Sequence, residues 1–378
     1  MPTITIDYTP AYEQGGGIGR YVRELTTALS VLDHQTDYRL FVTGVSPARL
    51  PDEPGKNFTW KPTRLTPTWL ARLWHRARLP IPVEVFTGRM QLYHATDFVL
   101  PPTLPGTKTL LTVHDLSFIR VPETASPGLR AYLEVVVPRS ARRADHILAD
   151  SEATRQDLIE LYRLPSERVT VLLSGVDSRF QPVLDSVVLM TTRSRYNIGG
   201  RPYILSVGTV QPRKNYSRLV QALANLRQGG LDVGLVIVGG RGWLEDTIYQ
   251  TIQETGMEEF VRFTGFAEED DLPALYSGAV CCALPSLYEG FGIPVLEAMA
   301  CGTPVVTSNI SSLPEVAGDA GLLVNPYDVE ELTEALQRLI EDSELRNDLI
   351  QRGFAQAKRF TWAESARHLR DIYQGMLG

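Results

Sequence analysis

Short apolar runs that alternate with helix-like stretches constrain the fold of this chain more than any other feature. Runs rich in Val, Ile and Leu, each followed by an amphipathic stretch, are typical of parallel sheets covered by helices. The clearest helical stripe runs from Ile18 to Leu32, where apolar residues recur at steps of four and three. The predicted strands are residues 3–6, 39–43, 91–95, 108–113, 146–150 and 168–173 in a first series, and residues 202–208, 234–240, 261–265, 279–285, 303–308 and 321–325 in a second.

A less regular stretch at about residues 177–200 separates the two series and predicts two domains. The length of 378 residues agrees with that number, since a domain usually holds roughly 100–200 residues. We therefore expect an α/β protein with two Rossmann-like, doubly wound domains, residues 1–180 and 181–360, that face each other across a cleft. We expect a last helix, residues 361–378, to begin at a capping box and to pack back on the first domain.

Charge, cysteine content and hydropathy exclude several classes of protein. The net charge of −7 argues against a general nucleic-acid binder, although residues 1–180 carry +2 and the remainder carries −9. Cys281, Cys282 and Cys301 fit neither a disulfide framework nor a metal-binding spacing, so we expect buried thiols. Because no apolar run reaches the ~18 residues of a membrane span and the N-terminus lacks a basic signal region, we expect a cytoplasmic protein.

The segment from Glu289 to Glu297, EGFGIPVLE, is the most informative stretch. Pro294 is suited to the first turn of a helix, which places Glu289 in the loop after a strand and Glu297 in the first helical turn. Gly290 and Gly292 let a ligand approach backbone N–H groups at the positive end of that helix. Two carboxylates beside such an anion site fit a ligand with hydroxyls at both ends and phosphates between them. The alternative is a helix-capping loop whose acids only complement the helix dipole.

Arg213 and Lys214 form a second candidate site directly after the predicted strand 202–208. Adjacent cations at the carboxyl end of a strand are well placed to hold a diphosphate. They would also stabilise the charge that develops on a departing phosphate, without a metal ion. A solvated basic turn is the alternative.

Two weaker candidates lie in the N-terminal half. Gly16 and Gly17 belong to a glycine run that opens a helix, where backbone N–H groups can face a phosphate or simply form a flexible turn. The run is not a dinucleotide fingerprint, because Arg20 stands where that motif requires glycine. His114 ends a predicted strand, where it can hydrogen-bond a sugar hydroxyl or a reacting group, or serve the structure alone.

Together these motifs resemble the retaining glycosyltransferases of family 4, whose type-B fold has two Rossmann-like domains. The resemblance covers nearly the whole chain in the same order, from GGGIGRY through TVHDLSF, RSARRADHILADSEATRQDL and LSVGTVQPRKN to the E-x7-E segment and SLPEVAGDAG. The chain looks most like bacterial mannosyltransferases of polysaccharide assembly. The resemblance implies a hexosyltransferase without cofactor or metal ion, which uses a nucleotide sugar and a saccharide or lipid-linked acceptor. GDP-mannose is the first choice of donor, and UDP-glucose and UDP-N-acetylglucosamine remain open.

The resemblance also implies roles for single residues. Arg213 and Lys214 match the pair that grips the donor diphosphate, and Glu289 matches the acid that contacts the hydroxyls of the donor sugar. Glu297 matches the carboxylate that binds ribose, and His114 matches the residue near the transferred sugar. The remaining matches are Gly16 and Gly17 over the phosphates, Gly290, Phe291 and Gly292 beside the sugar, and Gly265 and Phe266 at the base pocket.

The same assignment bears on the mechanism. We expect His114, Arg213, Lys214 and Glu289 to carry catalysis. Because Glu289 is assigned to sugar hydroxyls, no evident carboxylate nucleophile is left, and we expect substitution on the face that the diphosphate leaves. Two other classes are disfavoured. An NAD-dependent oxidoreductase conflicts with Arg20. The intact Arg213, Lys214, Glu289 and Glu297 argue against a degenerate, non-catalytic sugar-nucleotide binder, which only a measurement of turnover excludes.

Residues 60–80 form a local basic patch with five Lys and Arg, three Trp and no acid. A basic, Trp-bearing amphipathic segment can lie on an anionic membrane surface, which would place the enzyme on the inner face of the membrane. The alternative is an acceptor-side helix whose residues Trp60, Trp69 and Trp74 pack inward. No nucleic-acid partner is expected.

Overall fold

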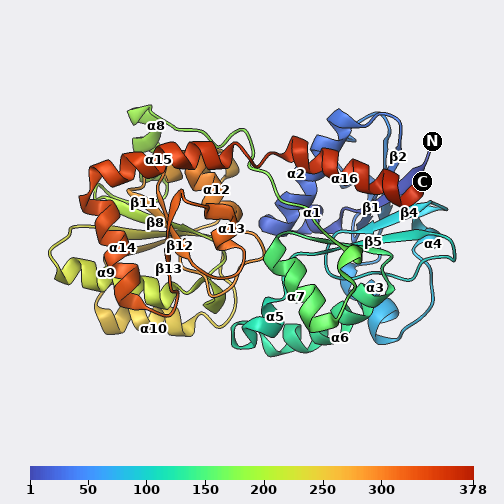
Figure 1. Cartoon of the computed structure of the whole chain (residues 1–378), viewed down its shortest axis with the longest axis horizontal. Coiled ribbons are helices and arrows are strands. Elements are labelled where there is room, and N and C mark those ends of the chain that lie inside the picture. Colours follow the sequence, from blue (N-terminus) through green and yellow to red (C-terminus); the bar gives the residue numbers. More distant parts are fainter. The chain divides into compact units, whose positions relative to one another are not determined.

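A computed structural model describes all 378 residues, which form two compact units (Figure 1). Unit 1 comprises Met1–Leu116, Ala131–Gly175 and Thr361–Gly378, and unit 2 comprises Ser117–Arg130 and Val176–Phe360. This division differs from the predicted ranges in two places. The first long stretch of unit 1 ends at Gly175 rather than at residue 180, and Ser117–Arg130 groups with unit 2.

Unit 1 is built on a seven-stranded parallel sheet. Its order, β3-β2-β1-β4-β5-β6-β7, changes direction between β1 and β4, as in doubly wound folds. All six strands predicted for this half are present, and β3 is an additional strand that lies partly in the basic patch. The strands are β1 (Thr3–Asp7), β2 (Asp37–Thr43), β3 (Phe58–Thr63), β4 (Leu92–Ala95), β5 (Lys108–Val113), β6 (His146–Ala149) and β7 (Val169–Val171).

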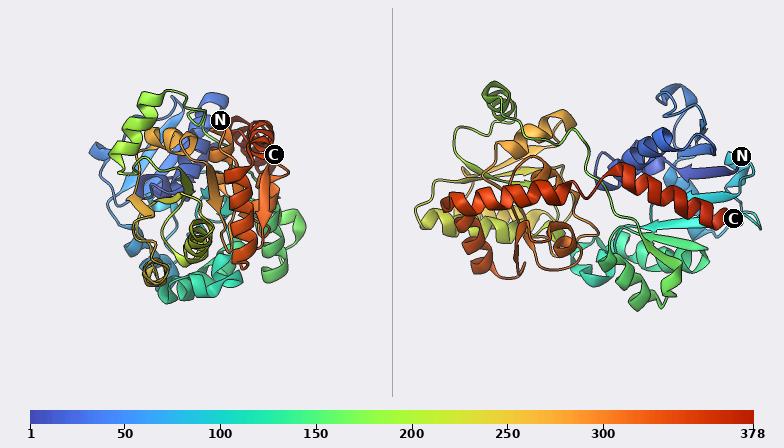
Figure 2. Two further views of the ribbon diagram at one scale, coloured as in Figure 1. Left: turned by 90° about the vertical axis from the view of Figure 1, so that its left-hand side faces the viewer. Right: turned by 45° about the horizontal axis from the view of Figure 1, so that its top comes forward.

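Helices lie on both sides of this sheet, and α2 packs along α16 (Figures 1 and 2). The predicted stripe is confirmed, since Val22, Leu25 and Leu29 of α2 are buried in the core together with Tyr373 of α16. Thr361 caps α16 as predicted by accepting a hydrogen bond from the N–H of Glu364. The helices are α1 (Thr9–Glu13), α2 (Gly17–Leu32), α3 (Pro67–Ala71), α4 (Glu84–Thr87), most of α6 (Pro127–Arg143), α7 (Glu152–Tyr162) and α16 (Trp362–Leu377).

Unit 2 repeats the design with a six-stranded parallel sheet in the order β10-β9-β8-β11-β12-β13. The order changes direction between β8 and β11, and all six predicted strands are present. The strands are β8 (Tyr203–Val207), β9 (Gly234–Val238), β10 (Val261–Gly265), β11 (Cys281–Leu284), β12 (Val305–Ser308) and β13 (Gly321–Val324). The helices are α5 (Ser117–Arg120), α8 (Ser186–Arg195), α9 (Tyr216–Gln228), α10 (Asp246–Thr255), α11 (Leu272–Ser277), α12 (Ile293–Ala300), α13 (Leu313–Ala317), α14 (Val329–Glu341) and α15 (Ser343–Ala357).

Two details of unit 2 differ from the predictions. Helix α8 lies in the stretch expected to be irregular. Its sequence lacks the apolar stripe that would have predicted a helix, and only Thr192 of this helix is buried. Asn215 precedes α9 as expected, but its side chain does not cap the helix. Its amide instead donates hydrogen bonds to the carbonyls of Pro285 (2.9 Å) and Pro326 (2.7 Å), which ties three loops together. The expected burial of all three cysteines is confirmed.

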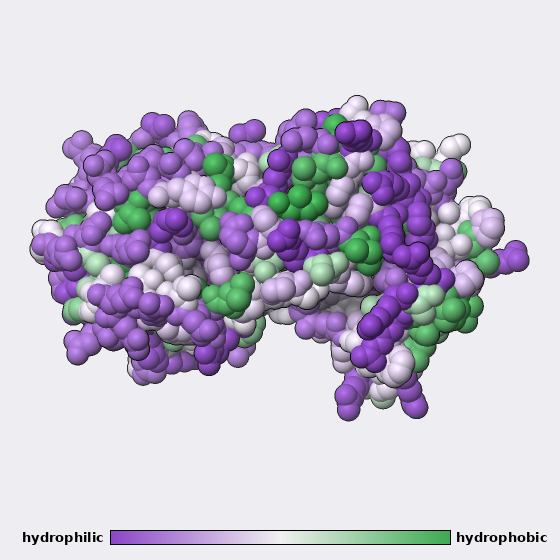
Figure 3. Space-filling view, turned by 90° about the horizontal axis from the view of Figure 1, so that it is seen from below, coloured by the Kyte–Doolittle hydropathy of each residue, from purple (hydrophilic) through white to green (hydrophobic).

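The surface mixes hydrophilic residues with small hydrophobic patches on the face shown in Figure 3. None of the helices combines the length and the apolar character that a membrane-spanning helix requires.

Two glycines at the start of α2, Gly17 and Gly19, predict a sharp contrast in stability. A Cβ atom at position 19 would lie 1.9 Å from the carbonyl oxygen of Gln14, whereas one at position 17 would meet nothing within 4 Å. We expect Gly19→Ala to destabilise unit 1 by about 1–3 kcal/mol and to lower its Tm by several degrees. Gly17→Ala, the matched control in the same helix, should keep or slightly raise the Tm, since Ala favours helix over Gly. Thermal unfolding followed by circular dichroism measures both, and equal Tm values would contradict this account of the turn.

Candidate functional site

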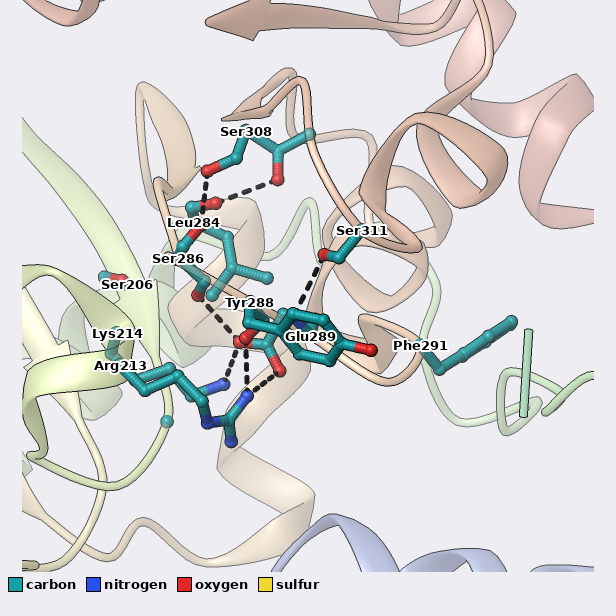
Figure 4. Close-up of polar contacts among 12 residues, drawn as sticks. Ser206, Arg213, Lys214, Leu284, Ser286, Tyr288, Glu289, Phe291, Ser308 and Ser311 are labelled. Atoms are coloured by element: carbon teal, nitrogen blue, oxygen red, sulfur yellow. Dashed lines mark hydrogen bonds and ion pairs between the residues drawn. The ribbon is translucent and has the colours of Figure 1, made fainter. Parts of the chain in front are cut away.

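The carboxyl ends of β8 and β11 flank the point at which the strand order of unit 2 changes direction. Ligands of doubly wound sheets bind at such a point. Arg213 and Lys214 follow β8 in a short 3-10 turn, and Glu289 follows β11. The structure therefore brings these three predicted residues together, as Figure 4 shows.

Glu289 forms ion pairs with both cations. Arg213 Nη1 lies 2.7 Å from Glu289 Oε2, and Lys214 Nζ lies 2.6 Å from Oε1. Ser286 Oγ also donates a hydrogen bond to Oε1 at 2.7 Å, so that donors hold both carboxylate oxygens. Arg213 Nη1 donates a further hydrogen bond to the carbonyl of Tyr288 at 2.7 Å.

The electrostatics of this cluster keep Glu289 ionised. Burial opposes the charge, but the nearby charges of Arg213 and Lys214 outweigh it and lower the pKa of Glu289 to about 2. With two cations and one carboxylate, the cluster retains one net positive charge. It can therefore attract a phosphate, while the carboxylate remains an acceptor for hydroxyl groups.

Small residues around the cluster fix its geometry. A Cβ atom on Gly208 would lie 2.7 Å from Lys214 Cε, so glycine is needed where the lysine chain crosses the end of β8. Ser311 Oγ accepts a hydrogen bond from the N–H of Glu289, and Ser312 Oγ donates to the carbonyls of Glu289 and Phe291. The sequence analysis did not assign a role to these serines or to Ser286. The position of Ser286 directly after a predicted strand was the one signal available for it.

The start of α12 matches the sequence expectation in part. Gly292 precedes the helix with a positive φ of 113°, and Pro294 lies in its first turn. The Phe291 side chain points away from the cluster in Figure 4 and packs edge-to-face against Phe360, with ring centroids 5.9 Å apart. Phe291 can therefore face a ligand at the cluster only through its backbone. Gly290, which has no side chain, likewise offers only its backbone.

Glu297 is placed differently from the prediction. Because α12 begins at Ile293, Glu297 is its fifth residue and lies beyond the first turn. Its side chain is 1% exposed, and Oε2 accepts a hydrogen bond from Tyr276 Oη at 2.7 Å. The structure thus joins Glu297 to α11 through this hydrogen bond.

A cavity of about 350 Å³ lies beyond the ends of β8, β9 and β10 in unit 2. Gly265, Arg241 and Tyr249 form part of its wall. Phe266 is 74% exposed, and its ring lies on the backbone of Gly240, where a Cβ atom would approach it to 2.3 Å. Phe263 adds a second aromatic ring to the lining beside Tyr249.

His114 lies in unit 1 and uses both of its ring nitrogens internally. Nδ1 lies 2.7 Å from Asp150 Oδ2, and Nε2 lies 2.8 Å from the carbonyl oxygen of Thr96. An ionised Asp150 and a carbonyl both accept hydrogen bonds, so this arrangement favours a proton on each nitrogen, which makes the ring an imidazolium. Burial opposes this charge, but Asp150 outweighs it and raises the pKa of His114 to about 9. The Tyr21 ring packs edge-on against it, with centroids 5.1 Å apart.

Asp150 could not be predicted from the sequence as a partner of His114, because the two residues follow different strands. Gly16 and Gly17, by contrast, lie where the sequence places them, at the N-terminus of α2. Added Cβ atoms on these two glycines would meet nothing within 4 Å. Room for a ligand is therefore left beside the backbone N–H groups of this helix end.

Residues 60–80 do not form one amphipathic helix. The segment starts in β3, continues through the five-residue α3 and ends in a π-helical turn, Arg72–Arg76, because prolines interrupt it. The indole N–H groups of Trp60 and Trp74 donate to carbonyls within unit 1. Trp69 is 55% exposed and carries the Arg72 guanidinium over its ring at 5.1 Å. Trp60 and Trp74 are thus half-buried and hydrogen-bonded within unit 1, and Trp69 faces outward.

Comparison with known proteins agrees with this architecture. Residues 15–180 match Glycosyltransferase Family 4, and residues 191–356 match Glycosyl transferases group 1. The chain is 32% identical over 371 residues to O-antigen chain mannosyltransferase B of Escherichia coli, which covers 95% of this chain and 96% of that protein. It is 33% identical over 290 residues to the serotype-specific mannosyltransferase WbdA of Escherichia coli, covering 75% of this chain but 35% of that longer protein.

Solved structures show the same fold. Sucrose-phosphate synthase from Thermosynechococcus elongatus superposes with a TM-score of 0.77 at 22% identity, covering 100% of this chain and 99% of that one. HepE from Anabaena, in complex with UDP and glucose, gives a TM-score of 0.73 at 20% identity, with 99% of each chain covered. The chain therefore belongs to the group 1 and family 4 glycosyltransferases and has their type-B fold of two parallel-sheet α/β units.

Proposed function

We propose that this glycosyltransferase transfers mannose from GDP-mannose, with retention of configuration, to a saccharide or lipid-linked acceptor in polysaccharide assembly. The choice of sugar rests on the similarity to O-antigen chain mannosyltransferase B, which extends over 95% of the chain. The reaction rests on one observation in unit 2, the Arg213–Lys214–Glu289 cluster with its net positive charge at the ends of β8 and β11. A UDP-hexose donor is the alternative, and HepE, of the same fold, is bound to UDP and glucose.

In this proposal, Arg213 and Lys214 hold the donor diphosphate and stabilise the charge that develops as it departs. The positive cluster replaces a metal ion in this role, so we expect turnover to persist in a chelator. The cavity lined by Gly265 binds the base, and Phe266 lies beside it. Gly16 and Gly17 offer the N-terminus of α2 to phosphate oxygens. Glu297, which accepts a hydrogen bond from Tyr276, is the carboxylate assigned to the ribose hydroxyls.

Glu289 is assigned to the hydroxyls of the donor sugar. Both of its oxygens accept hydrogen bonds from Arg213, Lys214 and Ser286, which lowers the carboxylate's nucleophilicity and fixes its orientation. A covalent glycosyl-enzyme intermediate on this carboxylate would require these bonds to break. We therefore propose substitution on the face that the diphosphate leaves. His114, whose ring Asp150 and Thr96 hold in place within unit 1, is assigned to the transferred sugar.

Replacing Lys214 tests the role of the cluster. We expect Lys214→Ala to lower kcat by about 10²–10³, because it removes a cation aimed at developing charge in a buried site. Steady-state release of GDP from GDP-mannose measures the effect. Lys358→Ala, which removes an exposed lysine of the same unit, is the matched control and should leave kcat unchanged. Near-normal turnover in Lys214→Ala would remove this residue from the mechanism.

The His114–Asp150 pair predicts a dependence of stability on pH. The pKa of His114 is raised to about 9 from 6.5, so its stabilisation is complete below about pH 6.5 and is lost as the pH rises through 9. We expect the Tm of the wild type to fall over this range, and Asp150→Asn to lower the Tm at pH 7 and to flatten the profile. Thermal unfolding between about pH 6 and pH 10 measures both. Parallel profiles for the two proteins would contradict the assignment of an imidazolium.

A donor screen tests the choice of GDP-mannose. A ligand that binds only the folded protein stabilises it by about 2.7 kcal/mol at 100 times its Kd, so the true donor should raise the Tm by several degrees. We expect GDP-mannose to give the largest shift among GDP-, UDP- and ADP-sugars, and to be the one sugar nucleotide turned over with retention, as judged by NMR of the product. A larger shift and turnover with UDP-glucose or UDP-N-acetylglucosamine would replace the proposed donor.

A further inference from the structure

Unit 1 holds a cavity of about 460 Å³ that none of the proposed donor-binding residues lines. It lies between the C-terminal end of α6 and the segment that follows the turn Arg72–Arg76. Its lining has an apolar part, which we call the floor, and a strongly basic part, which we call the rim. The floor contains Trp74, Leu79, Pro80, Pro102 and Val136, and the rim carries Arg78, Arg139, Arg142 and Arg143.

The positive charge of this rim is not neutralised within the protein. No aspartate or glutamate lines the cavity, and the guanidinium groups of Arg78, Arg139 and Arg142 form no ion pair. Arg143 donates to two backbone carbonyls, those of Leu100 (3.1 Å) and Pro101 (2.9 Å), so its charge is held at the rim but not cancelled. Four like charges around one cavity repel each other, and a bound anion would relieve that repulsion.

The dipole of α6 explains only part of this grouping of arginines at the rim. Arg142 and Arg143 lie in the last turn of α6, where cations complement the helix dipole. Arg139 lies one turn earlier, and Arg78 comes from a separate segment with a positive φ of 55°. The arginines therefore converge on the cavity from two elements, and dipole compensation alone does not require that arrangement.

The apolar floor indicates which class of anion the cavity would bind. Arginine side chains suit phosphate groups, because the planar fork of N–H donors matches the phosphate oxygens. Inorganic phosphate would leave the apolar floor in contact with water, whereas an apolar chain attached to the phosphate would cover it. His75, which also lines the cavity, adds no charge, because burial and the nearby Arg143 lower its pKa to about 4. The lining thus matches an organic phosphate with an apolar chain.

A second cavity shares the residues Trp74 and His75 with the first. It measures about 180 Å³ and lies where the strand order of unit 1 changes direction, at the ends of β1 and β4. Its lining mixes carboxylates, hydroxyls and aromatic rings, among them Asp7, Asp97 and Tyr132. Carboxylates repel phosphate but accept hydrogen bonds from sugar hydroxyls. The shared wall therefore separates a polar, acidic space from a basic, apolar one.

We propose that the arginine-rimmed cavity binds the phosphate or diphosphate of the acceptor together with the first part of an attached apolar chain. The sugar end of the same acceptor then occupies the smaller cavity over β1 and β4. This inference rests on the proposed function, because it names the chemical class of the acceptor for that transfer. It assigns Arg78, Arg139 and Arg142 to acceptor recognition and leaves the donor site in unit 2 untouched.

Direct binding tests the site without knowledge of the acceptor sugar. Farnesyl diphosphate serves as the probe, and farnesol and inorganic diphosphate each lack half of its chemistry. We expect calorimetry to show that farnesyl diphosphate binds at least about tenfold more tightly than either control. The double variant Arg139→Gln with Arg142→Gln should weaken that binding at least about tenfold and leave the Tm and GDP-mannose binding unchanged. Arg49→Gln, which removes an exposed arginine elsewhere in unit 1, is the matched control and should bind like the wild type.

Three outcomes would overturn the inference. They are farnesyl diphosphate binding that does not depend on Arg139 and Arg142, inorganic diphosphate that binds as tightly as farnesyl diphosphate, and arginine-dependent binding to anionic vesicles without binding of the monomeric probe. The last outcome would make the surface a membrane contact. Failure of the proposed function has a different signature, in which farnesyl diphosphate binds but no GDP-sugar or UDP-sugar binds or is turned over.

Discussion

The buried carboxylate of Glu289 is the constraint on which the site in unit 2 depends. A carboxylate that is 6% exposed is stable as an anion only if donors and cations surround it, and Arg213, Lys214 and Ser286 do so. These partners come from the loops after β8 and β11, so the ion pairs also fix the distance between those loops. The glycine at position 208 and the bridging amide of Asn215 are then needed to let both loops adopt this arrangement. The need to pair the buried charge of Glu289 thus determines the geometry of the site.

Each unit holds a buried charged side chain with its partners, but the two arrangements have different chemical consequences. In unit 1 the buried imidazolium of His114 is matched by Asp150 and by a carbonyl, which leaves the pair neutral and both N–H groups occupied. In unit 2 the cluster has one cation more than carboxylates. A neutral, fully bonded pair orients a ring but does not attract an anion, whereas a positive cluster does. This difference supports the assignment of the leaving diphosphate to unit 2 and of a positioning role to His114.

The sequence predicts the features that follow from local pattern and strand order. Apolar runs predict twelve strands correctly, and parallel strands explain why Arg213 and Glu289 meet, since both follow strands that end at the same edge. β3 is missed because its residues, FTWKPT, are largely polar and contain proline. Asp150 and Tyr276 are missed because their contacts with His114 and Glu297 join separate elements. A side chain's partner across elements depends on packing, which periodicity and spacing do not encode.

The placement of the basic residues distinguishes two kinds of cation in one chain of net charge −7. Arg213 and Lys214 are held by a carboxylate, which restricts their side chains to one geometry and suits a reaction in which charge develops at a defined atom. Arg78, Arg139 and Arg142 have no such partner, and their long side chains can adjust to a ligand that enters with a flexible chain. Fixed cations favour transition-state stabilisation, and unpaired cations favour the binding of an anionic ligand. A chain that is acidic overall thus holds two groups of basic residues with different surroundings, the arginines of the cavity in unit 1 and the ion-paired cations of unit 2.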